Sequence, residues 1–331
     1  MKIPHRRQFL HLAAGTAVLP AVSRIARAQP YPTRPITLVV PFAAGGATDV
    51  FNRIVSEHMS ITVGQRIVIE NVVGAGGTTG STRVMRATPD GYTILAGHVG
   101  THAASVPLYP RLPYNPETDF LPIGVAGAFS VIVVGRKGLP PNNAGEFVNY
   151  LKASGETLNV AHAGVGSVTH FTCLLLNSML GAKPTQVPFG GAAPAMNAIL
   201  AEQVDYMCVT APDAIQHISS GTVKAYLVGS LDRSPLLPTV PTSREVGLPE
   251  FQLWSWNALF APKGTPKHIL DLLTTALDKA LDDESTRKRL ADIGGEIPAK
   301  AQRGQDYLAA LVKAEIARFT PVIKAAGVSI Q

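Results

Sequence analysis

Cysteine is scarce in this sequence of 331 residues, which contains only Cys173 and Cys208. Two cysteines cannot hold together a chain of this length, so a disulfide-dense scaffold is excluded. There is no C-x-x-C pair of the kind that binds zinc or performs redox chemistry. Both cysteines lie in apolar stretches, which favours buried free thiols, although an oxidising compartment would leave a disulfide between them open.

Motifs for catalysis and for cofactor binding are also missing. The sequence has no G-x-x-x-x-G-K-[ST] loop, no G-x-S-x-G elbow and no H-E-x-x-H helix. Segment 74–80, Gly-Ala-Gly-Gly-Thr-Thr-Gly, follows an expected strand as a dinucleotide loop would. However, Thr79 stands where the third glycine belongs, and no acidic residue follows about twenty positions later. The nine histidines lack metal-ligand spacing. We therefore expect no enzyme, no cofactor and no metal.

Long apolar runs are lacking too, because no segment after residue 30 could form a transmembrane helix. Residues 1–28 instead have the order of a secretory signal peptide, with a basic start, a short apolar run and an A-x-A cleavage site. These parts are Lys2, Arg6 and Arg7, then residues 9–22, then residues 26–28. The adjacent arginines indicate export by the twin-arginine route, which predicts a periplasmic protein.

Charge is modest once this segment is set aside. Five of the 29 basic residues and none of the 23 acidic ones lie in residues 1–28. The remainder therefore has 24 basic against 23 acidic residues, a net charge of +1, whereas the whole chain carries +6. Because the excess positive charge belongs to the export segment, nucleic acid is not an expected partner.

Strand and helix patterns alternate along the rest of the chain. Residues 36–42 are a continuous apolar run, as a strand buried on both faces should be, and residues 49–61 have helical spacing of apolar side chains. Such alternation predicts an α/β fold with two mainly parallel sheets flanked by helices.

Two proline-rich passages, at 107–122 and 234–249, divide this pattern. The remaining length exceeds what a single core usually supports, so we expect two lobes. The first would comprise residues 29–122 and 253–331, and the second, residues 123–252, would be inserted into it. Two crossing strands, near 121–127 and 252–257, would form a hinge that lets the lobes close on a ligand.

Four glycine-rich loops occupy the expected carboxyl ends of strands, where ligands bind in open parallel sheets. They are residues 42–49, 97–102, 161–170 and 189–194. None contains lysine or arginine, whereas glycine turns and helix N-termini together supply backbone amides to an anion. A carboxylate held mainly by amides and hydroxyls is therefore the ligand we predict.

Several residues in these loops have a structural interpretation beside the functional one. Thr48, Asp49 and Ser167 are good helix caps, and His170 falls in the first turn of its expected helix. Asp213 is also a plausible cap, although its carboxylate would suit the amino group of an amino-acid ligand.

Taken together, six stretches resemble the Bug (Bordetella uptake gene) family, the extracytoplasmic solute-binding proteins of tripartite tricarboxylate transporters. They are residues 31–49, 70–77, 89–93, 101–102, 190–195 and 256–262. The resemblance implies a two-lobed periplasmic-binding-protein fold of type II character. It also implies a cleft for an organic acid and delivery of that acid to membrane transporter subunits. We expect the protein to be a monomer.

The candidate ligand-binding residues come from both lobes. They are Phe42, Ala44, Gly45, Gly46, Thr48, Asp49 and Thr101, and then Gly164, Gly166, Ser167, His170, Gly190, Gly191, Ala192 and Asp213. Two departures from the family concern residues 161–167, which have fewer hydroxyls, and Phe189-Gly190, where relatives commonly have Tyr-Arg or Tyr-Lys. These changes favour a less polar or aromatic acid. Alternative functions are ligand sensing through a receptor and, less in keeping with the sequence, hydrolysis in the same cleft.

Overall fold

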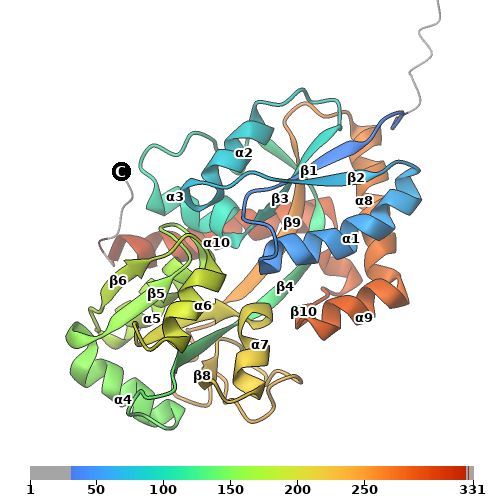
Figure 1. Ribbon diagram of the computed structural model, residues 1–331. Coiled ribbons are helices and arrows are strands. Elements are labelled where there is room, and N and C mark those ends of the chain that lie inside the picture. Colours follow the sequence, from blue (N-terminus) through green and yellow to red (C-terminus); the bar gives the residue numbers. More distant parts are fainter. Residues whose placement is uncertain (1–30, 326, 328–331) are drawn as a thin grey trace, which may run out of the picture.

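The computed structural model describes residues 31–325 and 327, so the predicted signal peptide at residues 1–28 lies outside the described residues. Helices and strands alternate as the sequence predicts (Figure 1). The strands are β1 (Ile36–Val40), β2 (Ile67–Asn71), β3 (Thr93–His98), β4 (Phe120–Arg136), β5 (Asn159–His162), β6 (Thr185–Pro188), β7 (Tyr206–Thr210), β8 (Val223–Val228), β9 (Trp254–Pro262) and β10 (Gly295–Glu296).

Ten α-helices and four short turns connect these strands in the described part of the chain. The helices are α1 (Ala47–Val63), α2 (Thr78–Met85), α3 (Ser105–Leu108), α4 (Ala144–Ser154), α5 (Val168–Leu180), α6 (Ala192–Leu200), α7 (Ala211–Ser219), α8 (Lys267–Asp282), α9 (Glu284–Asp292) and α10 (Gln305–Ala325). The turns are η1 (Ala75–Gly77), η2 (Gly100–Ala104), η3 (Gly155–Thr157) and η4 (Lys300–Gln302).

Strand β4 runs through both halves of the molecule. Up to Ser130 it pairs with β9, and from Val131 onward it pairs with β7 and β8. The strand order is β2-β1-β3-β9-β4-β7-β5-β6, with β8 and β10 also paired to β4. We call the part built on β2, β1, β3 and β9 the first lobe, and the part built on β7, β5, β6 and β8 the second lobe. The predicted two-lobed α/β fold is confirmed.

The pairing around β4 differs from a mainly parallel sheet. Strands β1, β2 and β3 are parallel, as are β5, β6 and β7, but every pair involving β4 or β9 is antiparallel. The crossing strand expected near residues 121–127 is also much longer, since β4 begins at Phe120 within the proline-rich passage and continues to Arg136. Pro122 is accommodated there because the register shifts between it and Gly124, and proline is tolerated at such irregularities.

Helices cover both faces of each sheet. In the first lobe α1, α8 and α9 pack together on one side, while α10 and α2 lie on the other. In the second lobe α6 and α7 cover one face, and α4 and α5 cover the other. Four leucines at helical spacing form the buried apolar face of α8: Leu270, Leu273, Leu277 and Leu281.

Helix α1 shows how the sequence sets the elements that flank the site. Its buried apolar residues, Phe51, Ile54, Val55 and Met59, recur at helical spacing and pack under the first-lobe sheet. The helix ends at Gly64, whose φ of 72° is the left-handed conformation that glycine adopts without strain. Its N-terminus directly follows the loop after β1, and this places it at the carboxyl end of the sheet.

The cysteines are buried and free, as the sequence favoured, and the backbone amide of Cys208 donates to Cys173 Sγ at 3.0 Å. Among the described residues, no helix combines the length and apolar character that a membrane crossing requires.

Candidate functional site

A cavity of about 550 Å³ lies between the lobes, at the carboxyl ends of the parallel strands. The first lobe contributes the loop after β1 and the loop after β2. The second lobe contributes the loops after β5 and β6 and the start of α7. Three of the four loops that the sequence singled out, at 42–49, 161–170 and 189–194, therefore meet around one opening, which we call the cleft. Loop 97–102 contributes only His98.

Five helix N-termini converge on the cleft, and each places at least one residue of its first turn or N-cap in the lining. The helices and their lining residues are α1 with Gly46, Ala47 and Thr48, α2 with Gly77, α5 with Ser167, Val168 and Thr169, α6 with Gly191 and Ala192, and α7 with Thr210 and Asp213. Helix N-termini carry unpaired amides and a partial positive charge, so this convergence favours a bound anion.

These helix ends are mostly uncapped. Within the described chain, no side chain caps α1, α2, α6 or α7, whereas Ser167 accepts from the His170 amide at the start of α5. No lysine or arginine is among the described residues that line the cleft. The positive potential there comes from backbone amides that no side chain caps, although the first amide of α2, that of Thr78, donates to the Ala75 carbonyl.

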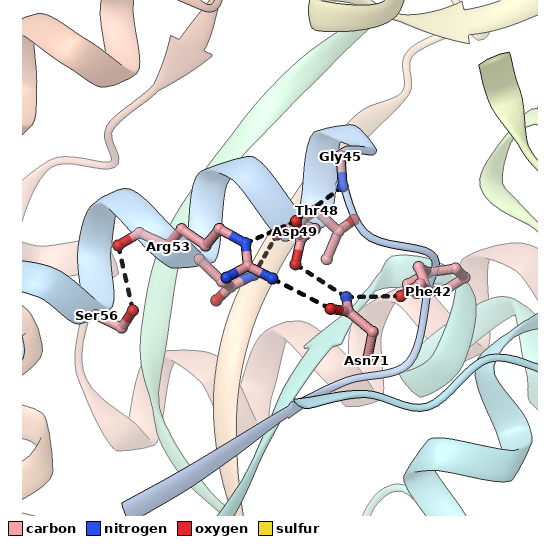
Figure 2. Close-up of polar contacts among 8 residues, drawn as sticks. Phe42, Gly45, Thr48, Asp49, Arg53, Ser56 and Asn71 are labelled. Carbon is pink, nitrogen blue, oxygen red and sulfur yellow. Dashed lines mark hydrogen bonds and ion pairs between the residues drawn. The ribbon is translucent and has the colours of Figure 1, made fainter. Parts of the chain in front are cut away.

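Asp49 holds the loop after β1 in place through hydrogen bonds, without lining the cleft itself (Figure 2). Its Oδ2 accepts from the Gly45 amide at 2.9 Å and from Arg53 Nε at 2.8 Å, and its Oδ1 accepts from Asn71 Nδ2 at 2.9 Å. The same Asn71 nitrogen donates to the Phe42 carbonyl at 2.9 Å. Burial would raise the pKa of Asp49, but hydrogen bonds from Arg53, Gly45 and Asn71 outweigh it and hold the pKa below its ordinary value. This anchored loop presents the start of α1 to the cleft.

The lobes touch along one edge of the cleft. The Tyr109 hydroxyl, which belongs to the first lobe, donates to the Ala75 carbonyl at 2.9 Å and lies 3.4 Å from the Val165 carbonyl of the second lobe. A Cβ added to Gly76 would lie 2.9 Å from the Val165 carbonyl oxygen and 3.1 Å from the carbonyl carbon of Gly166. Only glycine fits at this approach, so the structure has the lobes closed along this edge.

Asp213 is the one acidic side chain among the described residues of the lining. Its Oδ2 accepts from Thr210 Oγ1 at 2.7 Å. Burial raises the pKa of Asp213, and the hydrogen bond from Thr210 opposes this in part. The second lobe thus presents a hydrogen-bond acceptor that is costly to keep charged.

Replacing Asp213 with asparagine is expected to stabilise the protein at pH 7. Folding raises the pKa of Asp213, so the protonated carboxyl is favoured in the folded state. The contribution of Asp213 to the free energy of unfolding is therefore fully present below the unfolded pKa of about 3.8, and it is lost as the pH rises through the folded pKa. The gain in melting temperature of Asp213→Asn over the native chain should therefore be positive at pH 7 and vanish near pH 3.5. Asp232→Asn, in an exposed loop, is the control for the loss of one negative charge from the chain.

Most of the candidate residues come together in the cleft. Those in its lining are Phe42, Gly46, Thr48, Gly164, Ser167, Gly190, Gly191, Ala192 and Asp213. Those outside its lining are Ala44, Gly45, Asp49, Thr101, Gly166 and His170.

Thr101 and His170 lie behind the cleft wall. Thr101 is fully buried and bonded to the backbone of His98 and to the His102 ring. The Nδ1 of His170 accepts from the Gly166 amide at 3.2 Å, which braces the loop after β5. Burial lowers the pKa of His170 to about 3, so its ring is neutral.

Sequence reasoning missed part of the lining. The missed residues are Val73–Gly77, His98, Tyr109, Phe129, Thr210 and Ser255, among others. From the sequence, segment 74–77 was interpreted as an incomplete dinucleotide loop and as part of a stretch that resembles the family, but not as part of the site, although its glycines were the available signal. Four successive residues there have positive φ: Gly74, Ala75, Gly76 and Gly77, at 137°, 44°, 62° and 94°.

Comparisons with known proteins agree with this geometry. The model of the tripartite tricarboxylate transporter family receptor matches residues 51–328. The structure of MatC from Rhodopseudomonas palustris with bound malate is 47% identical, covers 88% of this chain and all of that chain, and superposes with a TM-score of 0.84. The periplasmic binding protein BugD is 40% identical over 91% of this chain and all of its own, with a TM-score of 0.85.

Another R. palustris structure, solved with adipate, is 31% identical over 91% of this chain and all of that chain, with a TM-score of 0.84.

Proposed function

The chain belongs to the tripartite tricarboxylate transporter receptor family, as its sequence predicted, and from this premise we propose that it captures a small organic acid for a membrane transporter. The relatives are solute-binding proteins, and two of them were solved with malate and adipate. In this chain the ligand would be held between the closed lobes and released unchanged, without catalysis, cofactor or metal.

The convergence of five helix N-termini on a cleft without cationic side chains among its described lining residues carries the proposal. Each helix end contributes about 0.3–1 kcal/mol to an exposed anion and up to about 2 kcal/mol when partly buried. Micromolar affinity needs about 8 kcal/mol. No single helix suffices, so the amides of both lobes must act together, and binding is coupled to closure.

The lining also supports a ligand with a small carbon skeleton. Apolar side chains, including Phe42, Phe129 and Phe189, surround the amides in a cavity of about 550 Å³. Dicarboxylates of four to six carbons are the class we place first, on the evidence of the malate- and adipate-bound relatives. Aromatic acids remain the second class, because of the phenylalanine-lined wall.

A thermal-shift screen tests this function. The mature chain would be melted with malate, succinate, adipate, citrate, nicotinate and benzoate in turn. An acid at one hundred times its dissociation constant should add about 2.7 kcal/mol to the free energy of unfolding, which raises the melting temperature by several degrees. Proton NMR of the same mixtures should show the acid unchanged after hours. If no acid raises the melting temperature, carboxylate capture is wrong, and turnover of a bound acid would favour the hydrolase alternative.

Export and assembly belong to the same proposal. We propose cleavage after residue 28, twin-arginine export to the periplasm, a monomeric state and docking to membrane transporter subunits. The lobes would be residues 29–122 with 253–331, and residues 123–252, with the hinge on the strands that cross between them. Periplasmic relatives such as BugD support the compartment. A sensing role would instead require the closed form to bind a receptor ectodomain, which a pull-down with ligand present would detect.

A further inference from the structure

His98 has the burial and the surroundings of a ligand-contacting group that the sequence did not single out. It is the last residue of β3, it is 3% exposed, and it is among the residues that line the cleft. The ring stacks on that of Phe42, with centroids 4.5 Å apart and planes inclined by 23°. A polar ring buried this deeply at a cavity wall has a fixed orientation.

The turn after β3 fixes the tautomer of this ring. The amides of Gly100 and Thr101 both donate to His98 Nδ1, at 2.7 Å and 3.3 Å. An Nδ1 that accepts two hydrogen bonds carries no proton, so the proton of the neutral ring is on Nε2. Gly100 is needed for this approach, because a Cβ there would lie 2.4 Å from His98 Cε1.

The opposite nitrogen is free for a ligand. Within the described chain, His98 Nε2 has no hydrogen-bond partner, yet it is not among the polar atoms sealed from solvent. Burial lowers the pKa of His98 to about 3, so the ring remains neutral at physiological pH. His98 therefore offers the cleft a single, oriented and uncharged N–H donor.

We propose that His98 Nε2–H donates a hydrogen bond to an oxygen of the bound organic acid and so determines which acids the cleft accepts. The inference rests on the proposed function. An acid that places a carboxylate, carbonyl or hydroxyl oxygen against His98 satisfies the donor. An acid that places an ammonium or a methylene there leaves a buried N–H unpaired and is rejected.

Two substitutions of His98 separate this donor from the structural role of the ring. In His98→Asn the side-chain oxygen can still accept from Gly100 and Thr101, but nothing replaces Nε2–H. In His98→Gln the terminal amide can reach the position of Nε2 and donate. His217→Asn is the control, since His217 lies in the last turn of α7 in the second lobe and does not line the cleft.

The test is calorimetric titration of L-malate and of adipate into the native chain and the three variants. We expect His98→Asn to weaken binding of the better acid by about tenfold to a hundredfold, as for loss of a hydrogen bond to a charged group. His98→Gln should recover part of that loss, and His217→Asn should bind like the native chain. Native-like affinity of His98→Asn would overturn the inference and leave the proposed function standing. If the native chain binds neither acid, the dicarboxylate assignment and this inference both fail.

Nitrogen-15 NMR of the imidazole gives a readout that does not depend on which acid is bound. We expect the Nε2–H tautomer in the free protein, and a downfield shift of the Nε2–H proton when a bound acid accepts from it. A ring protonated on Nδ1, or on both nitrogens at pH 7, would contradict the inference.

Discussion

Replacing Gly76 with alanine is expected to weaken ligand binding by about tenfold to a hundredfold while both lobes remain folded. The added Cβ would lie 2.9 Å from the Val165 carbonyl oxygen across the closed edge of the cleft. Overpacking of this kind costs about 1–3 kcal/mol. The Cβ would also lie 2.8 Å from the Tyr109 hydroxyl of its own lobe, which adds a cost that the open form shares. The contacts with Val165 and Gly166 are made only between closed lobes, so the closed population and the apparent affinity both drop.

Gly64→Ala is the matched control for this variant. Gly64 has a φ of 72°, close to the 62° of Gly76, and a Cβ there would meet no atom within 4 Å. Both variants therefore bear the strain of a left-handed alanine, and Gly76→Ala bears the overpacking in addition, but only Gly76→Ala should lose affinity in calorimetry. Equal affinity of the two variants would show that closure along this edge is not needed for binding.

Replacing Ala47 and Ala192 with proline is expected to weaken carboxylate binding by about tenfold for each and by at least about a hundredfold together. These are the first residues of α1 and α6, one in each lobe, and both line the cleft. Proline at the first helical position is compatible with the helix and removes one amide donor. A hydrogen bond to a charged group is worth about 1.5–3 kcal/mol, which sets the size of the loss.

The backbone around both alanines tolerates this change. Gly46 has φ −75° and ψ 165°, and Gly191 has φ 161° and ψ 175°, so each is in the extended conformation that a following proline requires. Glu284→Pro is the control, because Glu284 is the exposed first residue of α9, away from the cleft. Native affinity of the double variant, measured by calorimetry on protein with the melting temperature of the native chain, would contradict this prediction.

The parts of the site that could be predicted from the sequence are those in which a glycine turn is followed directly by the start of a helix. The loops after β1, β5 and β6 were found in this way, since each follows an apolar strand and precedes an amphipathic helix. Loop 97–102 was also placed at the cleft, but Thr101 was chosen from it as the candidate residue, whereas the structure has His98 in the lining. The reason is that β3 extends to His98, and the π-helical turn over Gly100–Ala104 then buries Thr101. A π-helical turn leaves no periodic signal in a single sequence.

Contacts between segments far apart in the chain were beyond sequence reasoning. Tyr109 falls in a proline-rich passage that reads as a linker, yet its hydroxyl bridges Ala75 and Val165 at the cleft edge. The antiparallel pairing of β4 with β9 joins residues more than one hundred positions apart. Asp49 was interpreted as a ligand contact or a helix cap. In the structure it is buried, and its carboxylate accepts hydrogen bonds from Gly45, Arg53 and Asn71 that fix the loop after β1.

Amide NMR during titration of a carboxylate tests the central claim most directly. If main-chain donors of facing lobes hold the acid, the amide protons of Ala47 and Thr48 in the first lobe and of Ala192 in the second should move downfield together at one dissociation constant. Shifts confined to a single lobe, or binding that moves none of these amides, would contradict the account.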